Sequence, residues 1–271
     1  MALEHQSTKA QSALLSTDLL AYYRHISQAD LSIVDLETTG SLAYKARVIE
    51  VSVLQASLAN GIQFQQTDLI NPGVHIPAQV TRITGLTQAM IAPAIAPEAV
   101  WPQYQPLLTT GVLTAHNLAF DYRFLQSEYQ RLGQTFERSP SQQFCTVLLS
   151  RLMLADLPSR SLPKLVEHFG FDVSESHRAA ADALACWYLA EYLLRQIQQE
   201  PDEVILQRFG QQWMRLKDAA KLLKCRKDEA YALLEKAQIA PRLSRSQKPL
   251  YRRGEVEKVF WQQQTQQLSL L

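Results

Sequence analysis

Two acidic residues at the end of a short apolar run have the types and spacing of metal ligands. Asp35 and Glu37 close the run Leu31–Leu36, which is typical of a strand. Residues two apart on a strand point to the same face. Two carboxylates ~4 Å apart repel by roughly 1 kcal/mol in water and ~4 kcal/mol at an effective dielectric near 20. A bound divalent cation would remove that cost, whereas a solvated strand end is the alternative for this pair taken alone.

A second segment places a histidine, an asparagine and another acid in one strand-to-helix connection. His116 and Asn117 follow a short strand, Gly111–Ala115, and Asp121 lies in the first turn of a helix expected over Phe120–Leu132. Asn117 is a plausible N-cap for that helix. Complementarity with the helix dipole would explain Asp121 alone, but it would not explain its neighbours.

A third segment contains His177 and Asp182, five residues apart. On one continuous helix this spacing would separate them by about 140°. They converge better if His177 precedes the helix on a loop and Asp182 lies one turn inside it. A histidine on such a loop suits a general base at neutral pH.

Together the three segments indicate a two-metal phosphodiesterase site. Oxygen ligands select Mg²⁺ or Mn²⁺, and two such ions ~3.5–4 Å apart can hold a scissile phosphate. His177 would deprotonate the attacking water. The predicted metal ligands are Asp35, Glu37, Asp121 and Asp182.

The order of elements predicts an α/β fold with a mixed five-stranded sheet flanked by helices. Asn60-Gly61 is a hairpin signal between two of the expected strands. The strands are expected at 31–36, 47–57, 62–70, 111–115 and 144–147, and the helices at 14–26, 78–83, 97–108, 120–132, 148–155, 162–169 and 179–198. We expect an N-terminal helical leader over 1–28, a catalytic domain over 29–200, a basic module over 213–262 and a tail over 263–271.

Composition favours a globular intracellular protein. The chain has 271 residues, of which 46% are hydrophobic, and no apolar run approaches the ~18 residues of a membrane span. The first ten residues lack the apolar stretch of a signal peptide, so we expect a cytoplasmic location. Three separated cysteines, Cys145, Cys186 and Cys225, are expected to be free thiols.

The net charge of +1 hides an uneven distribution. Residues 213–260 carry 13 basic and 6 acidic side chains, whereas residues 1–212 carry 14 and 20. A basic module joined to an acidic one suggests a nucleic-acid contact beside a carboxylate-rich site. A solvated basic face without a ligand is the alternative.

The three acidic segments resemble the three exonuclease motifs of the DEDDh family of 3′→5′ exonucleases, over roughly residues 29–197. The likeness is greatest to the proofreading epsilon subunit of bacterial DNA polymerase III and its stand-alone relatives. It implies an RNase H-like fold, four metal-binding carboxylates and His177 as the base, in place of the tyrosine of a sister class. It further implies substrate contacts by Thr38, Gly85, His116, Asn117 and Phe120.

The basic module resembles the excisionase and MerR-like winged helix-turn-helix group. Helices are expected at 216–223, 226–237 and 254–262, with a small β wing within 239–251. Phosphate contacts are then expected from Arg226, Lys227, Arg242, Arg245, Lys248, Arg252 and Arg253. The alternative is a small helical domain that binds a protein or packs on the nuclease.

The last residues resemble the short peptide with which bacterial replication and repair proteins bind the sliding clamp. Gln267, Leu268, Leu270 and Leu271 would provide the contacts, with apolar anchors entering a pocket of the partner. A frayed end is the alternative.

These observations favour a metal-dependent exonuclease that removes nucleotides from single-stranded or frayed DNA 3′ ends, in replication proofreading or repair. The same chemistry on RNA ends is the first alternative, since the motifs do not distinguish the sugars. A non-catalytic DNA-binding or replisome adaptor is the second, although an adaptor would have no physical reason to keep the acidic set.

Overall fold

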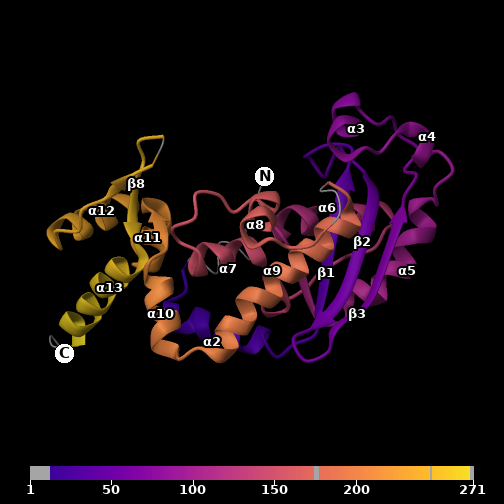
Figure 1. Cartoon of the computed structure of the whole chain (residues 1–271). Coiled ribbons are helices and arrows are strands. Elements are labelled where there is room, and N and C mark those ends of the chain that lie inside the picture. The colour runs from indigo at the N-terminus through magenta and orange to yellow at the C-terminus, as the bar shows by residue number, and fades with distance from the viewer. Residues whose placement is uncertain (1–12, 174–176, 245, 269–271) are drawn as a thin grey trace. The chain divides into compact units, whose positions relative to one another are not determined.

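The computed structural model describes residues 13–173, 177–244 and 246–268, and the chain divides into two compact units (Figure 1). The first unit contains residues 25–147 and 159–195. The second contains residues 1–24, 148–158 and 196–271, of which residues 1–12, 245 and 269–271 are outside the described part. Helix α2 (Ser16–Ile26) therefore falls largely with the C-terminal residues.

A mixed five-stranded sheet forms the centre of the first unit, in the order β3-β2-β1-β4-β5. The first three strands are antiparallel neighbours, and β4 and β5 continue the sheet in parallel with β1. The bounds are β1 Leu31–Thr38, β2 Val48–Ser57, β3 Gly61–Leu69, β4 Val112–Ala115 and β5 Gln143–Cys145. The expected mixed five-stranded sheet is confirmed.

The sequence of each strand agrees with its place in the sheet. Nearly every residue of β2 is buried, and its apolar run fits a strand covered on both faces. Strand β3 lies at the edge and exposes Gln63 and Gln65 among others, as an edge strand with polar side chains should. Gly61, with φ of 67°, allows the turn that joins the two.

Helices connect the strands and cover the sheet. Helix α5 packs against β1 and β2, while α6 packs against β1, β4 and β5. The helices are α3 Ala78–Thr84, α4 Gln88–Ile91, α5 Pro97–Thr109, α6 Leu118–Arg131, α7 Thr146–Met153, α8 Leu162–Phe169 and α9 Ala179–Gln199, with a 3₁₀ turn η1 at Pro140–Gln142. Figure 1 shows α9 as one long, continuous helix.

The C-terminal part of the second unit has helices around a small sheet ordered β6-β8-β7. Met214, Leu234, Tyr251 and Val256 belong to its apolar core. Its elements are α10 Asp202–Gly210, β6 Trp213–Arg215, α11 Leu216–Leu222, α12 Lys227–Lys236, β7 Arg242–Leu243, β8 Pro249–Arg252 and α13 Arg253–Leu268. The N-terminal helix is bound to this part, since Ser16 donates to the Glu257 carboxylate at 2.8 Å from both its amide and its hydroxyl.

Three features differ from the expected elements. Helix α10 occupies residues between the expected catalytic domain and the expected basic module, where no helix was expected, and it buries Ile205 and Phe209. Helix α13 continues to Leu268, beyond the expected end at 262. Asn117 stands at the start of α6 in a left-handed conformation with φ of 78°, and its side chain makes no capping hydrogen bond.

No helix among the described residues is long and apolar enough to cross a membrane. The three cysteines are free thiols, of which Cys145 and Cys186 are buried and Cys225 is partly exposed.

Candidate active site

Strand β1 and helix α9 bring three carboxylates together. Alternation along β1 puts Asp35 and Glu37 on one face, and Asp182 comes from the first turn of α9. One carboxylate oxygen from each of the three residues lies within 4.8 Å of the others. Oxygen donors at this spacing suit a divalent cation, so the residues present fit the expected metal.

Asp121 adds a fourth carboxylate close to the first. It lies in the first turn of α6, and only 3% of its surface is exposed. Its charge acts on Asp35 and Glu37 and raises the pKa of both. The backbone of Leu36 and of Asp121 itself opposes the rise in the pKa of this carboxyl group, so Asp121 lies close to β1.

Burial and mutual repulsion raise the pKa of the carboxylic acids in this cluster above their ordinary values. Burial raises the pKa of Glu37 to about 8, assisted by the charges of Asp182, Glu50 and Asp121. Burial likewise raises the pKa of Asp121 to about 8. The pKa of Asp35 is raised well above its usual value, first by burial and then by its acidic neighbours. Desolvated carboxylates in mutual contact are a physical signature of a site that needs cations.

His177 precedes α9 on a loop, as the five-residue spacing to Asp182 requires. Its side chain is exposed, its φ is 67°, and its backbone amide donates to Oδ2 of Asp182 at 3.2 Å. Burial raises the pKa of Asp182, while the hydrogen bond from His177 opposes that rise. The imidazole is thus free to meet a substrate beside the carboxylates.

A fifth carboxylate, Glu50 on β2, was not identified from the sequence. It stands directly opposite Glu37 in the β1–β2 ladder and is 1% exposed. It accepts hydrogen bonds from the Arg178 guanidinium and from the amide of Ala179. A glutamate inside an apolar strand, two residues after Val48, was the available signal, because such a residue needs a buried partner.

The second motif is partly structural. His116 Nδ1 lies 2.9 Å from Thr146 Oγ1, and Nε2 lies 2.8 Å from the carbonyl of Arg160. Both ring nitrogens are therefore engaged within the protein, and only the ring face is left for the expected substrate contact. Asn117 is exposed, and Phe120 is half-buried against Phe124.

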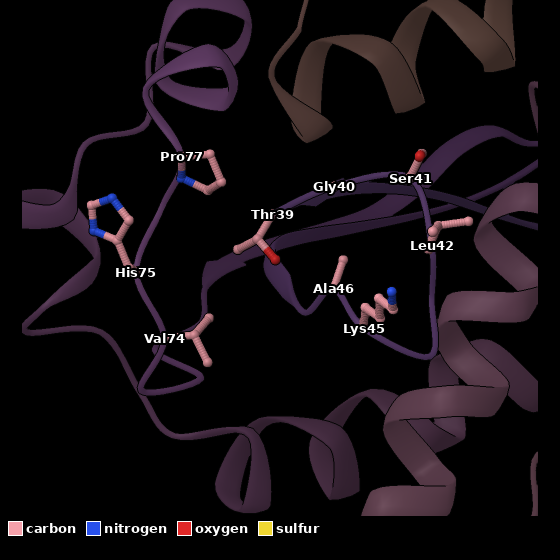
Figure 2. A pocket seen from close by; sticks show the side chains of 9 residues that line it. All are labelled: Thr39, Gly40, Ser41, Leu42, Lys45, Ala46, Val74, His75 and Pro77. Carbon is pink, nitrogen blue, oxygen red and sulfur yellow. The ribbon is translucent and has the colours of Figure 1, made fainter.

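A pocket of about 320 Å³ continues from the end of β1. Figure 2 shows the residues that line it. Val74, His75 and Pro77 come from the segment before α3, and the β1–β2 loop lies opposite them. The loop residues are Thr39, Gly40, Ser41, Leu42, Lys45 and Ala46. None of these was named as a site residue from the sequence, because the loop has no motif that marks it.

The other two substrate residues expected from the sequence are Thr38, at the end of β1, and Gly85, at the end of α3. The Thr38 hydroxyl donates to the carbonyl of Gly40 at 2.8 Å, which shapes the entrance to the loop. Gly85 ends α3 with φ of 74°, a left-handed conformation that favours glycine.

Side chains of helix α6 bind the β1–β2 loop that lines the pocket. Glu128, two turns after Asp121, is 1% exposed and accepts from Arg47 Nε at 3.0 Å and from the amide of Val48 at 3.2 Å. Arg131 donates to Glu128 and to the carbonyl of Ala43 in the loop. One helix thus supports both a carboxylate of the cluster and the wall of the pocket.

The basic residues of the C-terminal part divide into buried and exposed groups. Arg253 is 2% exposed and donates to Gln212, Glu257 and the carbonyl of Leu14. A phosphate contact by Arg253 is therefore wrong, because its guanidinium is buried and paired with Glu257.

The remaining basic candidates lie nearer the surface. Arg226 is exposed and pairs with Glu229, and Lys227 and Lys248 are exposed. Arg252 stacks on the Trp213 ring, with Cζ 3.9 Å from the centroid, and Arg242 approaches the same ring at 5.4 Å. Arg245 and the last three residues, including Leu270 and Leu271, lie outside the described residues. Gln267 and Leu268 close α13 and do not form an extended tail.

The sequence matches the family model described as Exonuclease (RNase_T) over residues 32–190. The chain belongs to the exonuclease family. The match includes the carboxylates Asp35, Glu37, Asp121 and Asp182, so the resemblance to DEDDh exonucleases is confirmed. Members of this family depend on divalent metal ions, in agreement with the carboxylate cluster.

Named relatives agree with this assignment. The chain is 31% identical to DNA polymerase III subunit epsilon of Aquifex aeolicus, over 56% of this chain and 73% of that protein. It is 28% identical to a PolC-type DNA polymerase III of Clostridium perfringens, over 63% of this chain but only 12% of that much longer protein.

A solved structure supports the fold. The chain resembles E. coli exonuclease I in complex with a dT13 oligonucleotide, with a TM-score of 0.56 and 19% identity. The alignment covers 62% of this chain and 42% of that chain.

Proposed function

We propose that this exonuclease acts from the 3′ end of DNA, releasing nucleotides by phosphodiester hydrolysis. The convergence of Asp35, Glu37 and Asp182 within 4.8 Å carries this proposal. Support for DNA comes from the similarity to an epsilon subunit and from the DNA oligonucleotide in the related exonuclease I structure. Proofreading or repair is the role that we infer from that likeness.

In the proposed mechanism, Asp35, Glu37, Asp121 and Asp182 hold two Mg²⁺ or Mn²⁺ ions. Bound there, such ions supply Lewis-acid chemistry, polarising the phosphate and neutralising charge on the leaving oxygen. His177, exposed on its loop, accepts the proton of the attacking water. The fixed backbone contact between His177 and Asp182 keeps the base next to the ligand.

The pocket after β1 is the place that we propose for the terminal part of the substrate. Leu42 and Val74 offer apolar surface for a base, while Lys45 offers a cation for a phosphate. Thr38, Gly85, Asn117 and Phe120 are proposed to line the path beside it, with His116 contributing its ring face.

The C-terminal part is proposed to be a winged helix-turn-helix-like module that binds DNA. Helix α12 carries Asp228, Glu229 and Glu235 against two lysines, so it is a poor candidate for lying against phosphates. The β7–β8 hairpin, residues 242–252, carries basic side chains and no acidic ones. We therefore place most of the phosphate contacts on Arg242, Lys248 and Arg252, with Arg245 in the same segment, and smaller ones on Arg226 and Lys227.

Binding of the sliding clamp by Gln267, Leu268, Leu270 and Leu271 remains a proposal from the sequence. Its test is a pull-down with a bacterial clamp, comparing the full chain with a variant in which Leu270 and Leu271 are replaced by alanine.

Digestion of 5′-labelled oligonucleotides tests the central proposal. The substrates are single-stranded DNA, 3′-recessed duplex DNA and single-stranded RNA, each with Mg²⁺, with Mn²⁺ and with chelator. A chelator-sensitive ladder that shortens from the DNA 3′ end is the expected result. A ladder on RNA alone would establish the RNA-trimming alternative, and tight DNA binding without any ladder would establish the adaptor.

A further inference from the structure

The start of α9 is fixed by a carboxylate from the neighbouring sheet strand β2. Glu50 accepts from Arg178 Nη2 at 2.6 Å, from Arg178 Nε at 3.2 Å and from the Ala179 amide at 2.9 Å. The first amides of a helix have no partner within the helix, and a negative charge at that end is favourable. Glu50 therefore caps α9 from outside, one turn before Asp182.

Two hydrogen bonds connect Asp182 to this fixed helix start. The amide of Asp182 donates to the carbonyl of Arg178 at 3.0 Å, and the amide of His177 donates to the Asp182 side chain at 3.2 Å. Any displacement of Arg178 would therefore move both the ligand and the base.

Glu50 is also a competing carboxylate. It stands opposite Glu37 in the ladder, and its charge reaches Asp35, Glu37 and Asp182. Arg178 occupies its two oxygens in a fork that matches the planar guanidinium. Without the arginine, the carboxylate could turn toward a cation held by its neighbours.

We propose that Arg178 and Glu50 form a positioning pair, which holds Asp182 and His177 in register with β1 and keeps Glu50 out of the metal-binding set. The inference rests on the proposed function of the carboxylate cluster. Neither residue is catalytic in this account, because each acts through Asp182.

Opposite charge changes at the two positions provide the test. Arg178→Met removes one positive charge and releases Glu50 as a ligand, so Mn²⁺ affinity should be unchanged or higher while kcat falls at least tenfold. Glu50→Gln removes a negative charge beside the cluster, so Mn²⁺ affinity should fall several-fold together with kcat. Arg178→Lys keeps the charge without the fork and should give intermediate kcat with wild-type Mn²⁺ affinity.

The double variant Glu50→Gln/Arg178→Met removes both the competing ligand and the arginine that holds it. Its kcat should exceed that of Arg178→Met. Arg195→Met is the matched control, since Arg195 lies on the same helix in an ion pair with Glu191 and should keep wild-type kcat and affinity.

Measurement of Mn²⁺ binding by calorimetry or electron paramagnetic resonance needs no turnover. If the wild-type protein cleaved no nucleic acid, the proposed function would fail, while the opposite shifts in Mn²⁺ affinity would still support the pair. Parallel losses of affinity and thermal stability in both single variants would overturn it, as would wild-type kcat in Arg178→Met.

Discussion

Glu37 and Glu50 face each other across the antiparallel ladder of β1 and β2, and the two carboxylates have different partners. Glu50 is held by Arg178, whereas Glu37 joins Asp35 and Asp182. Like charges directly opposite one another destabilise a sheet. Arg178 neutralises Glu50 and so offsets this repulsion. Among the described residues Glu37 has no such ion-pair partner, and its raised pKa agrees with a carboxylate that would be stabilised by a bound cation.

Replacement of a cluster carboxylate should remove activity without unfolding the protein. Asp35→Asn keeps the shape of the side chain and removes its charge. We expect nuclease activity to fall by more than ~100-fold, which is the largest loss usual for a residue that only supports a metal ligand. Activity on labelled DNA and the thermal midpoint are the two measurements. Glu191→Gln on α9, away from the cluster, is the control, and near-wild-type cleavage by Asp35→Asn would refute the site.

The metal-free protein should lose stability as the pH rises. The pKa values of Glu37 and Asp121 are about 8 in the folded protein, above the ordinary values of 4.5 and 3.8. Because folding favours their protonated forms, the stabilisation is complete below about pH 4 and is lost between about pH 4 and pH 8. Urea unfolding in chelator at pH 5 and pH 8 measures this.

Divalent cations should reverse that dependence. Metal binding requires deprotonated carboxylates, so Mg²⁺ or Mn²⁺ should stabilise the protein more at pH 8 than at pH 5. A metal-free protein with equal urea midpoints at both pH values would contradict the raised pKa values. In Glu37→Gln, the difference between the urea midpoints of the metal-free protein at pH 5 and pH 8 should be smaller.

His177→Gln should separate catalysis from metal binding. The side chain is exposed beside Asp182 and is proposed only to move a proton, so kcat should fall by roughly 10²–10⁴. Mn²⁺ affinity should stay within about twofold of wild type. A variant that loses both in equal measure would instead make His177 a ligand or a structural residue.

Glu128 should matter for stability more than any exposed acid. Its carboxylate is buried between Arg47 and Arg131, and removing one member of such a pair costs roughly 3–5 kcal/mol. Glu191→Ala, which breaks a partly exposed pair on α9, should cost about 1 kcal/mol or less. Urea unfolding compares an alanine variant of Glu128 with Glu191→Ala. Equal losses of unfolding free energy in the two would mean that the buried network is not cooperative.

Charge reversal should locate the DNA contact in the C-terminal part. The double variant Arg242→Glu/Lys248→Glu should weaken binding of duplex DNA and lower the slope of log affinity against log salt by roughly 2. Arg226→Glu/Lys227→Glu, at the start of α12, should have a smaller effect because Arg226 already pairs with Glu229. The opposite ranking would move the contact to α12.

Local patterns were enough to predict the candidate site residues because each is marked by its immediate neighbours. Asp35 and Glu37 follow an apolar strand, Asp182 lies one turn inside a helix, and the loop position of His177 follows from their spacing. The sequence did not predict the pairing of Glu50 with Arg178, because the two residues are 128 positions apart. Such a pair has no local signature.

The same reason explains the errors in the second unit. Arg253 was counted with the exposed basic residues, although Glu257 and Gln212 bury it. Helix α10 was not expected because its short apolar run is flanked by polar residues, and only Ile205 and Phe209 are buried. Net charge and composition report on a segment, whereas burial is decided by residues elsewhere in the chain.

The cluster joins residues from distant parts of the chain, since Asp182 follows Asp35 by 147 positions. At ~5–20 residues per second of synthesis, Asp182 leaves the ribosome roughly 7–30 s after Asp35. Until then, the nascent domain has no helix α9 and cannot complete its set of ligands. A chain that is still being synthesised therefore lacks the complete carboxylate cluster for most of its synthesis.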